Sequence, residues 1–194
     1  MWRKPFFLWP MLSLPFFYLL GLTVMGGLGA DPAKELVHST GEYALWLLML
    51  VMLASPVQFI LRRRQLFLIR RSLGVACFAY VFLHVLLYIA TYLEGSLQAL
   101  IEDLIKRPYI IAGAFAFIFG LAMALTSNDY SVRRLGIKWK SLHKSVYLMV
   151  VAVCVHIIWQ VKFDYGEVIL YSTFFALMFL LRGPSIRSRL VIKP

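Results

Sequence analysis

The sequence has few charged residues and very few acids. Only 15% of its 194 residues are charged, and 9 Asp and Glu stand against 20 Lys and Arg. A soluble domain carries about 25% charged and about 45–50% apolar residues. This chain is 61% hydrophobic, with a mean hydropathy of +0.79. Such an excess of apolar surface is incompatible with an ordinary soluble domain and predicts a chain that faces lipid.

Cysteine is also scarce. Cys77 and Cys154 both lie in apolar runs, and neither belongs to a CxxC or a CxxCH. The pattern gives no support to a zinc ribbon, a redox dithiol or covalent c-type haem attachment, and two small buried core residues are the simpler interpretation. The net charge of +11 does not predict a nucleic-acid partner, because the basic residues lie in short runs between apolar stretches rather than on one soluble face.

Six apolar stretches approach the roughly 20 residues that a membrane-spanning helix needs. They are Phe6–Met25, Tyr43–Leu61, Leu73–Leu93, Tyr109–Ser127, Leu142–Gln160 and Val168–Leu181, the last beginning a few residues earlier, near Tyr165. The first resembles a signal peptide, but its apolar run of about 20 residues exceeds the usual length of about 7–15, so we expect a retained helix. The sequence therefore predicts an all-α polytopic membrane bundle of about six transmembrane helices, with no soluble domain and no obvious internal repeat.

Basic residues are unevenly divided between the two ends of these spans. If the N-terminus is cytoplasmic, 16 of the 20 Lys and Arg fall on the cytoplasmic side, together with one acid, Asp129. Short cytoplasmic loops carry such an excess of Lys and Arg, so we expect both termini to be cytoplasmic. The run RRRQLFLIRR is most simply part of this topology signal, and a site for an anionic cofactor or lipid is a second interpretation.

Histidines are the chief ionisable residues within the spans, and no Asp or Glu accompanies them there. The chain has four, His38, His84, His143 and His156. Polar groups at membrane depth are costly and usually functional, and neutral imidazole is the usual axial ligand of b-type haem. The absence of carboxylates within the spans argues against a di-iron or zinc-hydrolase site. The pattern therefore favours b-type haem.

Depth predicts which histidines share an iron. His84 lies near the middle of the third span and His156 toward the outer end of the fifth, about 5 Å apart in depth. His143 precedes His156 by 13 residues, or roughly 20 Å along the helix axis. We expect His84 and His156 to be the axial ligands of one b haem near the outer leaflet. A hydrogen bond between helices is the alternative role for a histidine within a span.

His143 is expected to serve a second haem, or donor-side chemistry, near the cytoplasmic face. Thirteen residues rotate a helical side chain by about 220°, so either the fifth span is bent or His143 and His156 face different neighbours. The equivalent position on the third span is Arg71, which can pair with a haem propionate but cannot ligate iron. His38, at the outer interface, is expected to cap the start of the second span, and a direct contact with haem stays open.

Five short elements follow one another along most of the chain: GADP, HSTG, KRPY, ALTS and WKSLH, with HIIWQVK after the last. Their combination in this order resembles the MsrQ (YedZ) family, the haem-binding membrane subunits of periplasmic protein-methionine-sulfoxide reductase systems, within the ferric-reductase-like transmembrane group. His84, His143 and His156 fall on the positions that this family associates with haem. The wider group usually carries paired histidines on spans three and five, and this chain has one on span three, so the resemblance allows one or two haems.

The resemblance implies a single ferric-reductase-like transmembrane haem-binding domain over residues 1–194, in the lipid of a bacterial inner (cytoplasmic) membrane. It implies an electron-transfer subunit of an oxidoreductase system, with haem b and, on the resemblance alone, FMN. The donor would be the quinone pool or a cytosolic flavin reductase, and the acceptor a periplasmic molybdopterin methionine-sulfoxide reductase. Two other functions stay open: a ferric or other metalloreductase cytochrome b, and a haem-free transporter or assembly factor.

Overall fold

The computed structural model describes residues 8–61, 66–160 and 165–182 of the chain. Over these residues the chain forms nine α-helices and no strand, which confirms the predicted all-α fold. The helices are α1 (Leu8–Val24), α2 (Pro32–Leu61), α3 (Leu66–Tyr92), α4 (Leu97–Lys106), α5 (Pro108–Leu125), α6 (Asp129–Leu135), α7 (Ile137–His143), α8 (Val146–Gln160) and α9 (Gly166–Arg182).

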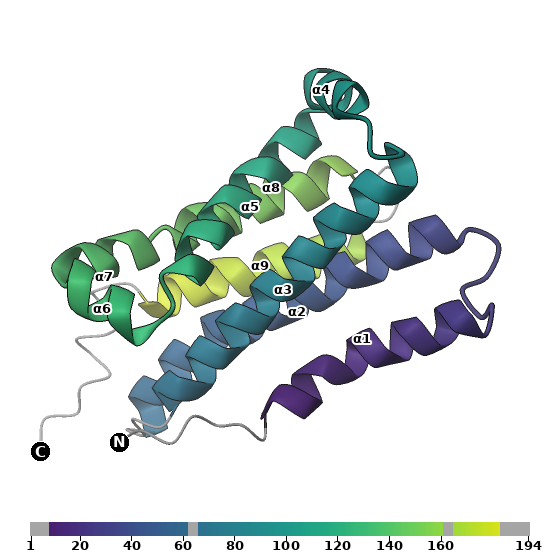
Figure 1. Cartoon of the computed structure of the whole chain (residues 1–194). Helices are drawn as coiled ribbons and strands as arrows, with labels where there is room; N and C mark the ends of the chain where they lie inside the picture. Colours follow the sequence, from purple (N-terminus) through teal and green to yellow (C-terminus); the bar gives the residue numbers. More distant parts are fainter. Residues whose placement is uncertain (1–7, 62–65, 161–164, 183–194) are drawn as a thin grey trace, which may run out of the picture.

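Six of these helices correspond to the six predicted spans. Four segments are long and apolar enough to cross a membrane: Pro32–Gln58, Ile69–Tyr92, Pro108–Leu125 and Ile137–Gln160, the last made of α7 and α8. Helices α1 and α9 have 17 residues each, about 26 Å of helix, and run alongside the others (Figure 1). The chain is a multi-pass membrane protein built as a helical bundle.

The bundle contains two principal helix pairs. α2 packs mainly on α3, and α5 packs mainly on α8. Small residues at the contacts let the backbones approach, as in other membrane bundles: Ala44 and Ala76 are buried between α2 and α3, where the Cys77 thiol donates to the Ala44 carbonyl at 3.3 Å. α9 packs against α2 and α8, and α1 against α3 and α2. Large apolar side chains elsewhere on the long helices are exposed, as lipid-facing positions require.

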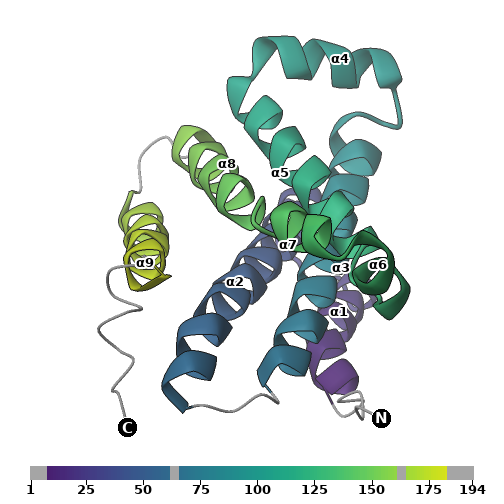
Figure 2. The same ribbon diagram turned by 90° about the vertical axis from the view of Figure 1, so that its left-hand side faces the viewer.

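The two ends of the bundle carry different short elements. α4 lies across the end where α3 finishes and α5 begins (Figure 2). α6 and α7 lie toward the opposite end, where α1 begins and α9 finishes (Figure 1). The described part of the chain thus starts with α1 and finishes with α9 at the same end of the bundle (Figure 1). Following the predicted orientation, we refer to the α4 end as the outer end and to the α6–α7 end as the inner end.

Two expectations about α2 and α3 need correction. α2 begins at Pro32 rather than near Tyr43, so His38 lies inside the helix and the prediction that it caps the second span is wrong. α3 begins at Leu66 rather than at Leu73, so the second basic pair of the RRRQLFLIRR run, Arg70 and Arg71, lies within the helix.

Candidate functional site

His84 and His156 face each other across the two helix pairs. The ring of His84 comes from α3 and that of His156 from α8, and their centroids are 6.5 Å apart with the ring planes at 90°. The structure therefore brings together the two histidines that depth pairs in the sequence, and it brings them close enough to act on one group.

A backbone carbonyl holds each of these two rings by its Nδ1 atom. His84 Nδ1 lies 2.8 Å from the Val37 carbonyl oxygen on α2, and His156 Nδ1 lies 2.7 Å from the Tyr109 carbonyl oxygen on α5. Because a carbonyl can only accept, Nδ1 carries the hydrogen in both rings. The neutral imidazole then has its lone pair on Nε2, the tautomer that binds a metal while the other nitrogen donates to a carbonyl.

Glycine makes room for both rings. A Cβ atom added at Gly41 would lie 3.1 Å from His84 Nδ1, and one added at Gly113 would lie 2.9 Å from His156 Nδ1. Contacts this short require the ring to move, so both glycines are fitted to the histidine opposite them. These glycines belong to the HSTG and KRPYIIAG stretches of the sequence, although the sequence alone does not predict what they contact.

This geometry suits two axial ligands of one metal ion. Metal–imidazole bonds are about 2.0–2.1 Å long, so two rings on opposite sides of one metal have centroids about 6.4 Å apart. The observed 6.5 Å agrees with that separation. The residues present therefore fit an iron held by two neutral imidazoles, as in a b-type haem.

A polar network lies at the outer end, one helical turn beyond His84. Tyr88, four residues after His84, donates to the Asp103 carboxylate of α4, and Arg107 Nε lies 3.3 Å from the same carboxylate. Arg107 also donates to the Tyr109 hydroxyl at 3.4 Å, and Tyr109 supplies the carbonyl that holds His156. α4 is thus tied to α3, which carries His84, and to α5, which holds His156.

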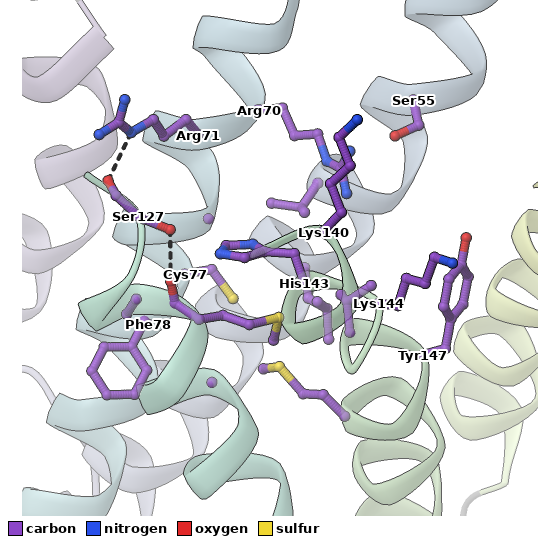
Figure 3. A pocket seen from close by; sticks show the side chains of 18 of the residues that line it. Ser55, Arg70, Arg71, Cys77, Phe78, Ser127, Lys140, His143, Lys144 and Tyr147 are labelled. Atoms are coloured by element: carbon purple, nitrogen blue, oxygen red, sulfur yellow. Dashed lines mark hydrogen bonds between the residues drawn. The ribbon is translucent and has the colours of Figure 1, made fainter. Parts of the chain in front are cut away.

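A second candidate site is a cavity of about 630 Å³ toward the inner end (Figure 3). Its described lining includes apolar side chains, Phe78, Met123 and Met149 among them, and one carboxylate, Asp129. It also includes five cations: Arg70, Arg71, Lys140, Lys144 and Arg182. A partly apolar cavity with this balance of charge favours a ligand that combines an apolar body with anionic groups.

His143 lies in this inner cavity and not beside the other two histidines. Its ring stacks on Trp139, with centroids 4.0 Å apart, and its Nε2 lies 3.2 Å from the Thr126 hydroxyl. The regular helix is interrupted between α7 and α8, and His143 and His156 face different neighbours, in agreement with the alternatives that the 13-residue spacing left open. Figure 3 shows His143 between Lys140 and Cys77, in the cavity with Arg70.

The other two residues considered from the sequence, Arg71 and His38, make contacts with neighbouring protein groups. Arg71 Nε donates to the Ser127 carbonyl at 2.7 Å, and its Nη1 lies 2.5 Å from the Asp129 carboxylate, so Arg71 joins α3 to the start of α6. The side chain of His38 is 55% exposed, and its Nδ1 lies 3.9 Å from the Glu42 carboxylate. His38 therefore stands apart from the facing pair of imidazoles.

Sequence reasoning missed several residues of both sites. The carbonyls of Val37 and Tyr109 belong to the backbone and leave no signal in residue type. Thr126 lies in the ALTS stretch, but its contact with His143 depends on the turn at Gly136, whose φ is +50°. Trp139 lies in the WKSLH stretch, four residues before His143 on α7, and this helical spacing is a signal that could have predicted their contact. A constant spacing between glycine and histidine is the one signal that could have found Gly41 and Gly113.

Comparisons with known proteins agree with this architecture. Residues 40–154 match the family described as ferric reductase like transmembrane component. The chain is 38% identical over 176 residues to a protein of Yersinia pseudotuberculosis serotype O:1b (strain IP 31758), covering 90% of this chain and 87% of that protein. It is equally similar to one of Yersinia pestis (strain Pestoides F), with 85% of that protein covered.

Both relatives are described as the protein-methionine-sulfoxide reductase heme-binding subunit MsrQ. No solved structure shows significant similarity to the chain. The family match covers Gly41, His84 and Gly113 and ends two residues before His156, while the similarity to the relatives extends over nine-tenths of the chain. The chain therefore belongs to the MsrQ family, within the ferric-reductase-like transmembrane group.

Proposed function

We propose that the protein is a membrane cytochrome b that carries electrons across a bacterial inner membrane to a periplasmic molybdopterin methionine-sulfoxide reductase. The observation that carries the proposal is the pair of facing imidazoles, His84 and His156, at the 6.5 Å separation that one iron requires. The relatives' description as heme-binding subunits of a protein-methionine-sulfoxide reductase supports the cofactor and the acceptor. In this account residues 1–194 act as one haem-binding domain.

The chain's own residues prepare the site for reversible one-electron chemistry. The Val37 and Tyr109 carbonyls fix the Nδ1–H tautomers, which leaves each Nε2 free to bind iron and raises the basicity of the ligand. Both rings are half-buried among the helices. A haem b bound there supplies a one-electron carrier whose potential depends on ligand identity, hydrogen bonding and burial.

The inner cavity suits the donor side of the same pathway. Its cations, with Arg70 and Lys140 beside His143, favour a second group with carboxylate or phosphate charges: the propionates of a second haem, or the phosphate of FMN. His143 would ligate a second haem or stand beside the flavin. Electrons would enter here from the quinone pool or from a cytosolic flavin reductase, and would leave at the outer end near α4.

An electron-delivery experiment tests this function. Purified protein in lipid vesicles is reduced with a quinol or with a flavin reductase, and reoxidation of the b-type absorption is then followed after addition of the periplasmic molybdopterin reductase with methionine sulfoxide. We expect reoxidation only when the molybdopterin protein and its substrate are both present. Reoxidation by ferric citrate alone, with none by the methionine-sulfoxide system, would instead favour the metalloreductase function.

His84→Ala serves as the control in that assay. This variant loses one ligand of the outer pair, so it should accept no electrons from the donor into a low-spin b species. Wild-type protein that shows no haem absorption after expression with adequate haem would contradict the proposal and favour the haem-free transporter or assembly factor.

A further inference from the structure

The two halves of the histidine site are related by a constant shift along the sequence. Each residue of the second half lies 72 residues after its counterpart in the first half: Tyr109 after Val37, Gly113 after Gly41, and His156 after His84. The first set lies on the pair α2–α3 and the second on the pair α5–α8. We call each set a histidine-holding unit: a carbonyl at position i, a glycine at i+4 and a histidine at i+47.

The geometry of the two units agrees atom by atom. In each unit the histidine Nδ1 faces the carbonyl, at 2.8 Å and 2.7 Å. In each unit the glycine position faces the same ring atoms in the same order, Nδ1 then Cε1 then Cγ: 3.1, 3.2 and 3.9 Å at Gly41, and 2.9, 3.1 and 3.6 Å at Gly113.

The side chains around the units have not kept this likeness. The shift of 72 residues relates Leu48 to Gly120 and Cys77 to Met149, which differ in size and chemistry. The sequence therefore shows no obvious repeat. Packing alone does not require the same ring contacts in two differently packed helix pairs.

We propose that Gly41 and Gly113 are positioning residues, which hold the two imidazole planes perpendicular and thereby set the spin signature and redox potential of the bound haem. This inference rests on the proposed haem site. Each glycine leaves room for one ring orientation, and the two orientations meet at the observed interplanar angle of 90°. A methyl group at either glycine would lie within 3.2 Å of its ring, so that ring would have to turn or move away.

Perpendicular ligand planes have a measurable consequence. Each imidazole then interacts through its π orbitals with a different one of two iron d orbitals, so these orbitals stay close in energy and the ferric low-spin EPR signal has a large gmax. Turning one ring toward the plane of the other separates the orbitals and lowers gmax. A ring that moves away from its carbonyl also loses part of the Nδ1–H hydrogen bond, which makes the ligand less basic and raises the midpoint potential.

The test compares Gly41→Ala and Gly113→Ala with wild-type holoprotein by low-temperature EPR and by redox titration. We expect a large gmax in the wild type, and a lower gmax with a higher midpoint potential in both variants. The effect should be larger for Gly113→Ala because its contact is shorter. Gly21→Ala, on α1 with nothing within 4 Å of the added methyl group, is the matched control and should keep the wild-type values.

A thermal-stability comparison keeps the inference testable if either glycine variant loses its haem. In the wild-type background Gly41→Ala should lower the melting temperature, because the added methyl group pushes against the His84 ring. In the His84→Ala background that ring is gone, so the same substitution should not lower it. Gly113→Ala faces His156, which that background keeps, so this substitution should still lower the melting temperature. Both double variants are compared with His84→Ala itself, so the contribution of bound haem cancels.

Two results would overturn the inference. One is a glycine variant pair that keeps its haem with wild-type gmax and midpoint potential. The other is a Gly41→Ala effect on melting temperature that is the same with and without His84. Wild-type protein that binds no haem would refute the proposed function instead, and the comparison of melting temperatures would still show whether the glycines fit the rings.

Discussion

His84 and His156 differ from the other two histidines in what holds their rings. Each donates from Nδ1 to a main-chain carbonyl, which is fixed in place by its helix and cannot donate in return. His143 instead meets the hydroxyl of Thr126 through its Nε2 atom, and that hydroxyl donates to the Ala122 carbonyl at 2.8 Å. The outer pair is therefore restricted to the tautomer that leaves Nε2 free for iron, whereas the hydrogen bond of His143 uses Nε2 itself.

Alanine variants of three histidines separate the two sites. His84→Ala or His156→Ala should abolish most of the low-spin b-type absorption, because each removes one of two axial ligands. His143→Ala should leave the outer haem largely intact, since its ring lies in the inner cavity. The measurement is the reduced visible spectrum with haem quantitation, and His38→Ala is the control. Equal loss of haem in all three single variants would contradict two separate sites.

At the residue scale the sequence predicts that His84 and His156 form a pair, but it does not predict which groups contact their rings. The helical rise per residue is enough to place His84 and His156 at similar depth. It cannot predict that Gly41 and Gly113 face the rings, because that contact depends on the rotation and closeness of α2 against α3 and of α5 against α8. Backbone carbonyls, present at every residue, give no signal at all.

At the scale of elements, α1 depends on a side chain from α3. Pro15 lies inside α1, next to a break in its regular hydrogen bonding. The Tyr80 hydroxyl accepts from the Phe16 amide at 3.1 Å and donates to the Leu12 carbonyl at 2.8 Å. Those two backbone groups would otherwise bond to each other, so Tyr80 is inserted into the helix and ties it to the bundle.

Tyr80→Phe tests this connection. The variant keeps the ring but leaves the Phe16 amide and the Leu12 carbonyl without their hydroxyl partner, which should cost about 1–3 kcal/mol. Thermal unfolding in detergent measures the loss, and hydrogen exchange should locate it in α1. A variant as stable as the wild type, with unchanged exchange in α1, would show that the two backbone groups pair again directly.

α4 is the element that apolar stretches do not predict. Its residues Leu97, Ile101 and Ile105 form an exposed apolar stripe, with charged residues on the other face. Ser96 caps its first turn by accepting from the Ala99 amide at 3.2 Å. A search for long apolar runs passes over such a helix because its period is amphipathic, and α2 extends beyond its predicted start for the same reason.

Asp103→Asn should loosen α4 without disturbing the histidines. The change weakens the contacts with Tyr88 and Arg107, so amide exchange in α4 should accelerate while the haem spectrum stays as in the wild type. Glu102→Gln is the matched control. Lys106 lowers the pKa of Glu102, but both side chains are exposed, and exposed ion pairs add little stability. Equal exchange in both variants would contradict a special role for Asp103.

At the scale of the whole molecule, the two ends differ in charge. The inner cavity gathers five cations, whereas the outer end carries most of the acids, Asp31, Glu35, Glu102 and Asp103 among them. This division is the structural counterpart of the 16 basic residues on the predicted cytoplasmic side. It orients the proposed pathway, with anionic donor-side groups at the inner end and the histidine pair toward the outer end.

Labelling of single cysteines tests the orientation. A cysteine at Gln98, on α4, should react with a membrane-impermeant maleimide in intact cells with a permeable outer membrane. A cysteine at Ser131, on α6, should react only after the inner membrane is opened. The native Cys77 is buried, and a variant without Cys77 and Cys154 provides the background. The reverse pattern of labelling would contradict cytoplasmic termini.

The whole bundle could be predicted from apolar length and basic residues, because lipid thickness fixes the first and membrane topology the second. Its organisation into two helix pairs could not. The repeat of carbonyl, glycine and histidine lies in geometry, and residue identity preserves it only at Gly41 with Gly113 and at His84 with His156.

The most direct test of the central claim is the dithionite-reduced minus oxidised visible spectrum of the detergent-purified protein, with pyridine haemochrome quantitation of haem per chain. We predict a low-spin b-type spectrum with at least one haem per chain, and a second haem only if His143 holds one in the inner cavity. Protein expressed with adequate haem that shows no b-type absorption would contradict the assignment of His84 and His156 as a ligand pair.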